Sequence, residues 1–268
     1  MERRILGTSG LKVPAVGMGT WRTFDVSGVA LEAERKQVVD VAIDSGATLF
    51  DTSPMYGDAE DVLSGAIAGR RDAVLVADKI WATNATDATQ QIARALGWYG
   101  GRVDVYQIHN LVAWNLHLPV LERLRDEGRV TVVGATHYQH SAFEDLLALM
   151  RTGRIGQIQV PYNVADRVIE KTILPAAADL GIGVIIMRPF GEGALFHRRP
   201  ADDLLQPLHE FGVRTWGQVL LKWILSDPRI HSVIPATSSP DRMRENADAG
   251  SPPWFDSATR DYVSGLLH

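Results

Sequence analysis

The sequence predicts an α/β fold, a single (β/α)8 TIM barrel with an N-terminal β-hairpin, and two observations carry this prediction. Eight short, apolar, β-branched segments recur along the 268 residues, and helix-like stretches with apolar residues three and four positions apart alternate with them. Apolar strands that alternate with helices are typical of a parallel sheet buried on both faces, and eight such strands close a barrel. We therefore expect residues 1–268 to form one domain.

The expected elements begin, in chain order, with the hairpin. The segment ILGTSGLKVP (5–14) turns at Ser9-Gly10 and is expected to plug the N-terminal mouth of the barrel. The eight expected strands cover residues 15–20, 48–52, 73–79, 103–109, 130–136, 155–160, 184–188 and 232–237. Helical spacing is clearest in residues 32–46, 58–69, 87–98, 118–128 and 141–153, and several of these stretches end at glycine.

The interval between the seventh and eighth strands is longer than the others. Residues 191–213 are a candidate lid over the barrel mouth, and the amphipathic segment 216–227 follows them. The competing doubly wound fold is disfavoured, because Gly17-Met18-Gly19 is not continued by the third glycine of the dinucleotide-binding pattern.

Composition excludes several classes of partner. The formal net charge is -5 and no block rich in Lys and Arg occurs, so we expect neither nucleic acid nor an anionic membrane surface as a partner. The absence of cysteine excludes disulfides, thiolate metal ligands and a cysteine nucleophile, and fits a cytoplasmic location. No apolar run is long enough to span a bilayer, and no apolar segment follows the charged N-terminus, so we expect neither export nor membrane insertion.

Ionisable side chains stand at the ends of three successive expected strands. Asp51 ends the second strand, Lys79 the third and His109 the fourth, while Tyr56 lies in the loop after Asp51. Each residue alone could be structural, as a helix cap, a core histidine or a snorkelling lysine. Their joint occurrence at the C-terminal strand ends, where barrel enzymes carry their active sites, favours a catalytic cluster.

The chemistry of this cluster depends on the phenol of Tyr56. A phenol ionises near pH ~10, so it needs help to exchange a proton at neutral pH. We expect the Lys79 ammonium to stabilise the phenolate and the His109 imidazole to share the hydrogen bond of the hydroxyl. Asp51 would keep Lys79 charged and oriented. The cluster thus predicts a proton donor to a carbonyl oxygen that accepts charge.

Five segments carry a resemblance to the aldo-keto reductase family: LGTSGLKVPAVGMGTW, DTSPMYG, ADKI, DVYQIH and IPATSSPDRMREN. The resemblance spans nearly the whole chain, and the family's catalytic tetrad corresponds to Asp51, Tyr56, Lys79 and His109. It implies the same barrel fold and an oxidoreductase that carries hydride from NADPH to an aldehyde or ketone. It also implies that the tyrosine protonates the resulting alkoxide.

The resemblance further implies a set of cofactor positions. Thr136-His137 stands where the family commonly has Ser-Asn for the carboxamide, and Met187 resembles a subset that stacks methionine on the nicotinamide. The residues implied as cofactor-binding are Gly19, Thr20, Trp21, Asp51, Thr136, His137, Gln159, Met187, Arg188, Pro189, Phe190, Gly191, Thr237, Ser238, Arg242, Glu245 and Asn246.

One departure from the family pattern concerns the cofactor's phosphate. Ser238-Ser239-Pro240-Asp241 predicts a helix N-terminus suited to phosphate, and Arg242 corresponds to a residue at the adenosine 2'-phosphate. Ala236 stands where many members have a lysine for that phosphate. We expect NADPH/NADP+ as the cofactor, with weakened discrimination against NADH.

The substrate pocket is expected to have aromatic walls. The resemblance implies substrate contacts from Trp21, Tyr56, Trp81, His109 and Asn110, and Trp114 lies in the same loop as Asn110. Such walls favour apolar or aromatic small-molecule carbonyls. No long C-terminal loop follows the last helix, so an open pocket is expected, on a monomer or weak homo-oligomer.

Two other classes of function stay open at this point. A non-catalytic barrel could sense the nicotinamide cofactor, although the intact tetrad argues against it. A Schiff-base aldolase or lyase could use Lys79 as its nucleophile, but needs a neutral amine that Asp51 should keep charged. No metal site is expected, since His137 and His140 lack a partnered carboxylate cluster.

Overall fold

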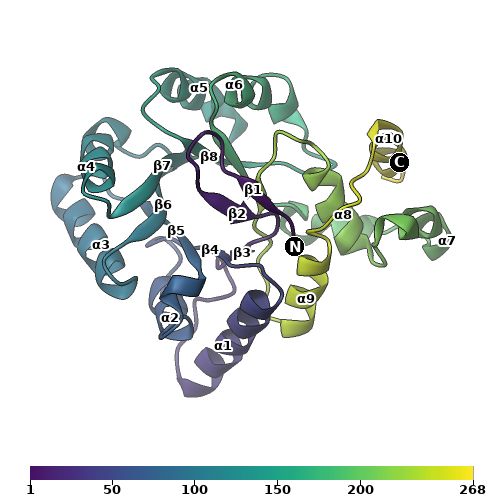
Figure 1. The fold of residues 1–268 in the computed structure, drawn as a ribbon, viewed down its shortest axis with the longest axis horizontal. Coiled ribbons are helices and arrows are strands. Elements are labelled where there is room, and N and C mark those ends of the chain that lie inside the picture. Colours follow the sequence, from purple (N-terminus) through teal and green to yellow (C-terminus); the bar gives the residue numbers. More distant parts are fainter. Residues whose placement is uncertain (268) are drawn as a thin grey trace.

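The computed structural model describes residues 1–267 and shows a parallel sheet whose strands follow one another in chain order (Figure 1). Isolated parallel bridges join Val16 to Val233 and Gly19 to Ala236, so the first and last strands meet and close the barrel. The predicted (β/α)8 fold is therefore confirmed. The barrel strands are β3 (Met18–Gly19), β4 (Leu49–Asp51), β5 (Leu75–Ile80), β6 (Val103–His109), β7 (Val130–Thr136), β8 (Gln157–Pro161), β9 (Gly183–Met187) and β10 (Ser232–Val233).

Helices surround the barrel in Figure 1, because each connection between parallel strands crosses the outside of the sheet. Their apolar faces pack on the outward side chains of the strands in one extended core. These helices are α1 (Val29–Asp44), α2 (Ala59–Ala66), α3 (Ala85–Trp98), α4 (Trp114–Asp126), α5 (Phe143–Arg151), α6 (Ile173–Asp179), α8 (Trp216–Leu225) and α9 (Pro240–Asp248). The five helices expected from apolar spacing are all present.

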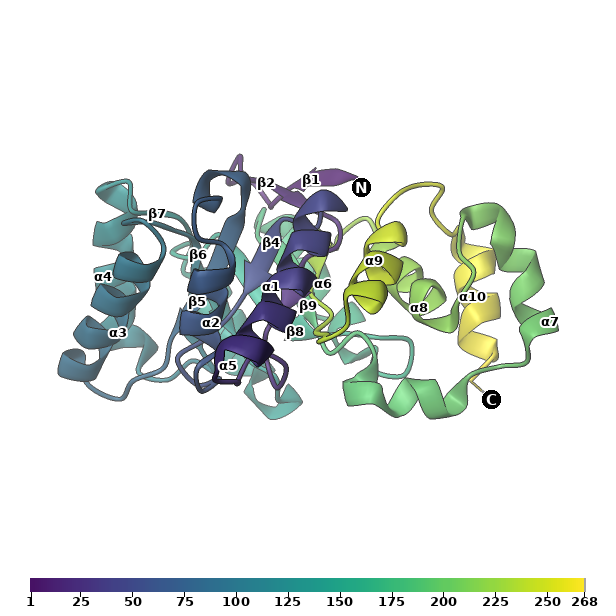
Figure 2. The same ribbon diagram turned by 90° about the horizontal axis from the view of Figure 1, so that it is seen from below.

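The N-terminal hairpin closes one end of the barrel, as expected. Strands β1 (Arg3–Ile5) and β2 (Lys12–Pro14) pair antiparallel and lie across that end in both views (Figures 1 and 2). Leu6 and Val13 are fully buried against apolar side chains inside the barrel, among them Val105. At Gly7, with φ 56°, a Cβ would lie 2.3 Å from the Gly181 carbonyl oxygen, so the turn needs glycine to dock this closely.

Side chains inside the barrel change from apolar to polar along the strands. Near the hairpin the interior holds Leu49, Ala77 and Val105. Two positions further along the same strands, on the same side of the sheet, lie Asp51, Lys79 and Gln107. The polar layer therefore lies toward the C-terminal strand ends, the end opposite the hairpin.

The long interval after β9 is mostly helical. It contains 3-10 turns at Gly191–Arg198 and Gln206–Phe211 and the short helix α7 (Asp202–Leu205). In Figure 2, α7 and the last helix, α10 (Ser257–Gly265), lie together beside α8, away from the barrel centre. Helix α8 was expected to be amphipathic, but every residue in it is buried, because α9, α10 and the 251–255 segment cover its outer side. No helix among residues 1–267 is both long and apolar enough to cross a membrane.

Candidate active site

The polar layer centres on a buried ion pair. Lys79 Nζ lies 2.6 Å from Asp51 Oδ1 and also donates to the Thr52 carbonyl oxygen at 2.7 Å. The Lys79 side chain is fully buried and Asp51 nearly so. Because an unpaired charge at this depth would cost several kcal/mol, the geometry requires the two ions to remain together.

Two glutamine amides satisfy the other oxygen of Asp51. Gln159 Nε2 donates to Asp51 Oδ2 at 2.7 Å, and Gln107 Nε2 donates to the same oxygen at 3.2 Å. Asp51 thus accepts hydrogen bonds from three different strands, which fixes its carboxylate plane. Gln159 was expected to contact the cofactor, and in the structure its amide nitrogen faces Asp51, which leaves Oε1 as its acceptor for another group.

Tyr56 lies beside this pair, with its ring centroid 5.1 Å from Lys79 Nζ. Burial outweighs the opposing charge of Lys79 and raises the pKa of the Tyr56 phenol above its ordinary value. Burial acts to lower the pKa of Lys79, but the Asp51 charge overcomes it, so this pKa is raised. Lys79 does favour the phenolate, as expected, yet the net effect is a phenol that stays protonated at neutral pH.

His109 faces Tyr56 edge to face, with ring centroids 5.7 Å apart and planes at 90°. Its Nδ1 lies 2.8 Å from the hydroxyl of Ser53, a fully buried residue. Burial first, and then the charge of Lys79, lower the pKa of His109 to about 2, so the ring is neutral. The expected hydrogen bond between His109 and the Tyr56 hydroxyl is not formed within residues 1–267.

Most expected nicotinamide contacts come together at the same end of the barrel. The strand pairing sets Gly19 beside Asp51 and Thr136 between His109 and Gln159. Thr20 donates its hydroxyl to the Asp51 carbonyl oxygen at 3.0 Å. Within residues 1–267 the buried Thr136 Oγ1 has no hydrogen-bond partner, so this wall offers an unused polar group to a ligand.

The loops after β3 and β9 meet above the barrel mouth. Glu192 lies 3.1 Å from Arg188 Nε and 3.6 Å from Arg22 Nη1. Both guanidinium groups lie near the Trp21 ring, at 5.9 and 4.2 Å from its centroid. Arg22, Arg188 and Glu192 all have left-handed backbone conformations, an arrangement that clusters at functional sites. Pro189, Phe190 and Gly191 continue this turn, and Phe190 packs against Phe196.

The N-terminus of α9 lies just after β10. Ser239 caps it by accepting the Arg242 amide, and the Thr237 hydroxyl accepts the Ser239 amide at 3.1 Å. Ser238 and Arg242 are exposed, and Arg242 forms no ion pair with the described residues. The carboxylate of Glu245 is hydrogen-bonded to the Thr215 hydroxyl, and Asn246 is buried.

The expected substrate-binding residues Trp81 and Asn110, and the nearby Trp114, differ in exposure and in local structure. Trp81 is 43 % exposed, and Gln91 pins its backbone through two hydrogen bonds of 2.8 Å. Asn110 has a left-handed φ of 53° in the turn that follows β6, and Trp114 begins α4. His137 accepts the Gln139 amide while His140 pairs with Asp166, so these two histidines do not converge on one point.

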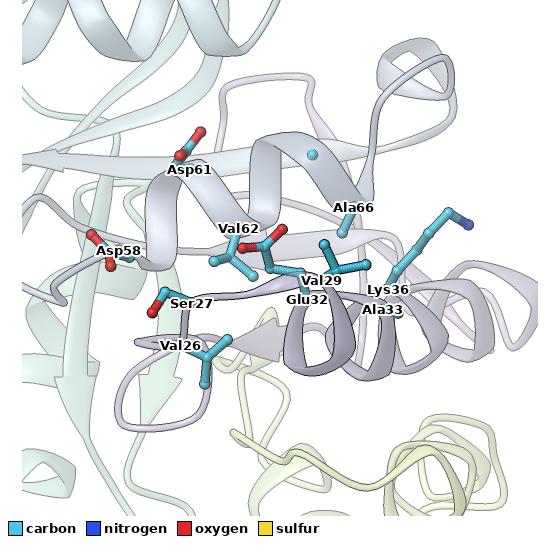
Figure 3. Close-up of a pocket in the computed structure, with 11 residues that line it drawn as sticks. Val26, Ser27, Val29, Glu32, Ala33, Lys36, Asp58, Asp61, Val62 and Ala66 are labelled. Atoms are coloured by element: carbon cyan, nitrogen blue, oxygen red, sulfur yellow. The ribbon is translucent and has the colours of Figure 1, made fainter.

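A groove of about 460 Å³ lies elsewhere, between α1 and α2 (Figure 3). Its charged side chains are Glu32, Lys36, Asp58 and Asp61. None of the residues expected in the catalytic, cofactor or substrate sites lines it. The groove is therefore separate from the cluster at the strand ends.

Two residues of the cluster were missed in the sequence. Gln107 could have been found from the sequence, because it precedes His109 by two positions and therefore faces the same side of the strand. No sequence pattern indicated Ser53, because its partner His109 is 56 residues away in the chain.

The fold and the site together define a class of protein. A closed parallel barrel carries a buried Lys-Asp pair, a tyrosine and a neutral histidine at its C-terminal end, the end that bears the active site in barrel enzymes. The class is that of a (β/α)8 barrel with a cluster of ionisable side chains at the end where barrel enzymes carry their active sites.

Residues 15–259 match the model of the Aldo/keto reductase family, so the chain belongs to this family of oxidoreductases. It is 27% identical to the aldo-keto reductase YhdN of Bacillus subtilis (strain 168), over 73% of this chain and 64% of that protein. It is 24% identical to the NADH-specific methylglyoxal reductase of Escherichia coli (strain K12), over 93% of each. A solved aldo-keto reductase from Klebsiella pneumoniae in complex with NADPH superposes with a TM-score of 0.83 at 25% identity, covering 100% of this chain and 96% of that one.

Proposed function

We propose that this protein reduces aldehydes or ketones to alcohols with NADPH, and that Tyr56 is the proton donor. The observation that carries the proposal is the buried Lys79 ammonium, held by Asp51 beside the Tyr56 ring at the barrel mouth. When bound, the nicotinamide supplies a hydride to the carbonyl carbon. The protein must then supply one proton to the carbonyl oxygen.

Tyr56 is suited to this task because burial keeps its phenol protonated until a base is present. The alkoxide oxygen that forms on the substrate is a far stronger base than the phenolate. Once Tyr56 has given up its proton, the Lys79 charge stabilises the phenolate in a site shielded from water. Asp51 keeps Lys79 charged and fixed, and neutral His109 contributes a hydrogen bond to the substrate oxygen.

The residues at the strand ends fit a nicotinamide carboxamide. Thr136 Oγ1 is buried without a partner, and Gln159 has one amide oxygen left after its bond to Asp51. These groups would hold the carboxamide, while Met187, the last residue of β9, would pack on the ring. Gly19, Thr20 and Trp21 on one side and His137 on the other would complete the walls.

The phosphates would lie between two features of the mouth. The turn at Arg188–Gly191 would contact the pyrophosphate, and the capped N-terminus of α9, with Thr237 and Ser238, would receive the adenosine phosphate. Arg242 would pair with the 2'-phosphate, with Glu245 and Asn246 next to the adenine. Because Ala236 supplies no second cation, NADPH preference would rest on Arg242 alone. The NADH-specific methylglyoxal reductase shows that NADH use occurs among the relatives.

The proposed substrate is a small carbonyl compound that enters between Trp21, Trp81 and Asn110 and reaches Tyr56 and His109. The exposed Trp81 ring and the half-buried Trp21 ring would contact its apolar part. We further propose that the protein acts as one cytoplasmic domain, monomeric or weakly associated.

The test is a titration of the protein with NADPH and with NADH, followed by intrinsic tryptophan fluorescence, and then addition of an aromatic aldehyde. We expect tighter binding of NADPH and aldehyde-dependent loss of its absorbance. Binding without oxidation across aldehydes and ketones would favour a cofactor sensor. A covalent adduct on Lys79 after borohydride treatment with a carbonyl compound would favour a Schiff-base enzyme.

A further inference from the structure

We propose that Ser53 is a positioning residue that holds His109 in the tautomer with its proton on Nε2, so that His109 donates a hydrogen bond to the substrate oxygen. The inference deepens the proposed function and rests on it, because the donor matters only if a carbonyl compound binds beside Tyr56. It adds to the reaction a residue from outside the four ionisable side chains.

The first step is the hydrogen-bond inventory of the Ser53 hydroxyl. Its oxygen accepts the Met55 backbone N–H at 3.2 Å and lies 2.8 Å from His109 Nδ1. Within residues 1–267, Nδ1 is the only acceptor in reach of the hydroxyl hydrogen. A proton on Nδ1 would leave that hydrogen buried without a partner, so the satisfied arrangement has Ser53 donating to a bare Nδ1.

The second step concerns the other ring nitrogen. A neutral imidazole carries one N–H, and burial keeps His109 neutral. If Nδ1 accepts from Ser53, the proton is on Nε2. No residue in 1–267 accepts a hydrogen bond from Nε2, so this donor is available to a bound molecule.

The third step is the place of Ser53 in the chain. It begins the turn that carries Tyr56, whose backbone N–H donates to the Ser53 carbonyl oxygen at 3.0 Å. One serine therefore joins the tyrosine turn after β4 to the histidine at the end of β6. The Tyr56 hydroxyl and His109 Nε2–H are thereby carried on adjacent rings, 5.7 Å apart between centroids, and we infer that both polarise one carbonyl oxygen.

The direct test is a nitrogen-15 NMR spectrum of the histidine side chains, with His109 assigned by the loss of its signals in His109→Gln. The wild-type protein should show His109 only as the Nε2–H tautomer. A wild-type spectrum with the proton on Nδ1 would overturn the proposal without any variant. The proposed reductase function would not be contradicted by that result.

The matched variants are Ser53→Ala, Ser53→Thr and Ser226→Ala. Ser53→Ala should give a mixture of tautomers and lower kcat about 10- to 100-fold, with an unchanged Kd for NADPH. Ser53→Thr retains the hydroxyl and should restore both the tautomer and most of kcat. Ser226→Ala loses a comparable pair of hydrogen bonds at the C-terminal end of α8 and should leave kcat and the His109 signals unchanged.

Full kcat and a single Nε2–H tautomer in Ser53→Ala would refute the role of Ser53 while the proposed reduction stands. If the wild-type protein binds NADPH but oxidises it with none of the carbonyl compounds tested, the proposed function fails instead. The NMR spectra would still decide which group sets the tautomer of His109.

Discussion

At the scale of single residues, the site depends on how Asp51 divides its two oxygens. Oδ1 binds the Lys79 ammonium, and Oδ2 takes the amides of Gln107 and Gln159. The carboxylate therefore has no oxygen left to act as a base on substrate. The pairing with Lys79 agrees with the sequence-based expectation, and the Asp51 charge helps to raise the pKa of Lys79 against the effect of burial.

Arg242 provides the residue-scale prediction. Arg242→Ala should weaken NADPH binding about tenfold or more and leave NADH binding nearly unchanged, because the guanidinium would contact only the 2'-phosphate. Titrations with the two cofactors by tryptophan fluorescence would measure this difference.

The matched control for this prediction is Arg244→Ala. Arg244 lies on the same helix but faces Asp241 at 3.5 Å. Its loss should change the affinity for neither cofactor. An equal effect of both substitutions would mean that only the overall charge of α9 matters.

The cluster of Asp51, Lys79 and His109 was predictable from the sequence because ionisable residues are unusual at the ends of apolar strands. The raised pKa of the Tyr56 phenol was not predicted. Burial outweighs the charge of Lys79 there, and how deeply a loop residue is buried follows from packing rather than from its neighbours in the chain. Gln159 was predicted to contact the cofactor alone. Its hydrogen bond to Asp51 joins residues 108 positions apart, so no local sequence pattern could indicate it.

At the scale of elements, strands and helices were predictable where apolar spacing is regular. The eight strands and the hairpin follow from short apolar runs and from the Ser9-Gly10 turn. The helical turns between Gly191 and Phe211 were not predicted, because proline, glycine and charged residues interrupt their periodicity. The full burial of α8 was not predicted either, because the segments that cover its outer side follow it in the sequence.

The hairpin provides the element-scale prediction. Leu6 is fully buried under the barrel, so Leu6→Ala should lower the free energy of unfolding by about 2–5 kcal/mol. Since the hairpin lies at the end opposite Tyr56, kcat at a temperature well below unfolding should not change. Denaturant unfolding monitored by circular dichroism, together with an activity assay, measures both quantities.

Ile5→Ala is the control for the hairpin, because Ile5 lies one residue earlier and is 53 % exposed. It should change stability by no more than about 0.5 kcal/mol. A Leu6→Ala effect as small as that of Ile5→Ala would show that the hairpin is not a plug.

At the scale of the whole molecule, two buried acids on the outer side of β5, Glu60 and Asp78, affect stability, and Asp78 Oδ1 also accepts the backbone N–H of Lys79 at 2.7 Å. Burial, reinforced by the neighbouring Asp78, raises the pKa of Glu60 to about 9, and burial raises that of Asp78 to about 6. Both lie between the barrel and its outer helices, where the Tyr99 hydroxyl donates to the Glu60 carbonyl oxygen at 3.1 Å. A carboxyl proton held by Glu60 keeps this region free of two adjacent negative charges.

The sign of the pH dependence follows from proton binding. Between its ordinary pKa of 4.5 and about 9, Glu60 holds a proton in the folded state and not in the unfolded state. The folded state then binds more protons, so this group makes stability fall as pH rises through that range. Glu60→Gln should remove this contribution.

The expected result is a variant as stable as the wild type near pH 5 and more stable by on the order of 1–3 kcal/mol near pH 9. Denaturant unfolding at several pH values measures the difference, in which contributions from groups that do not contact Glu60 cancel. The exposed Glu144→Gln should follow the wild-type curve. A constant difference between Glu60→Gln and wild type at all pH values would contradict the account.

The most direct test of the proposed mechanism is the turnover and NADPH affinity of Tyr56→Phe. The substitution removes only the phenolic oxygen, which acts on the substrate and contributes little to holding the nucleotide. We predict a loss of kcat of at least about 10²-fold with NADPH affinity nearly unchanged, and wild-type behaviour for the control Tyr262→Phe on α10. Turnover of Tyr56→Phe near that of the wild type would contradict the assignment of Tyr56 as the proton donor.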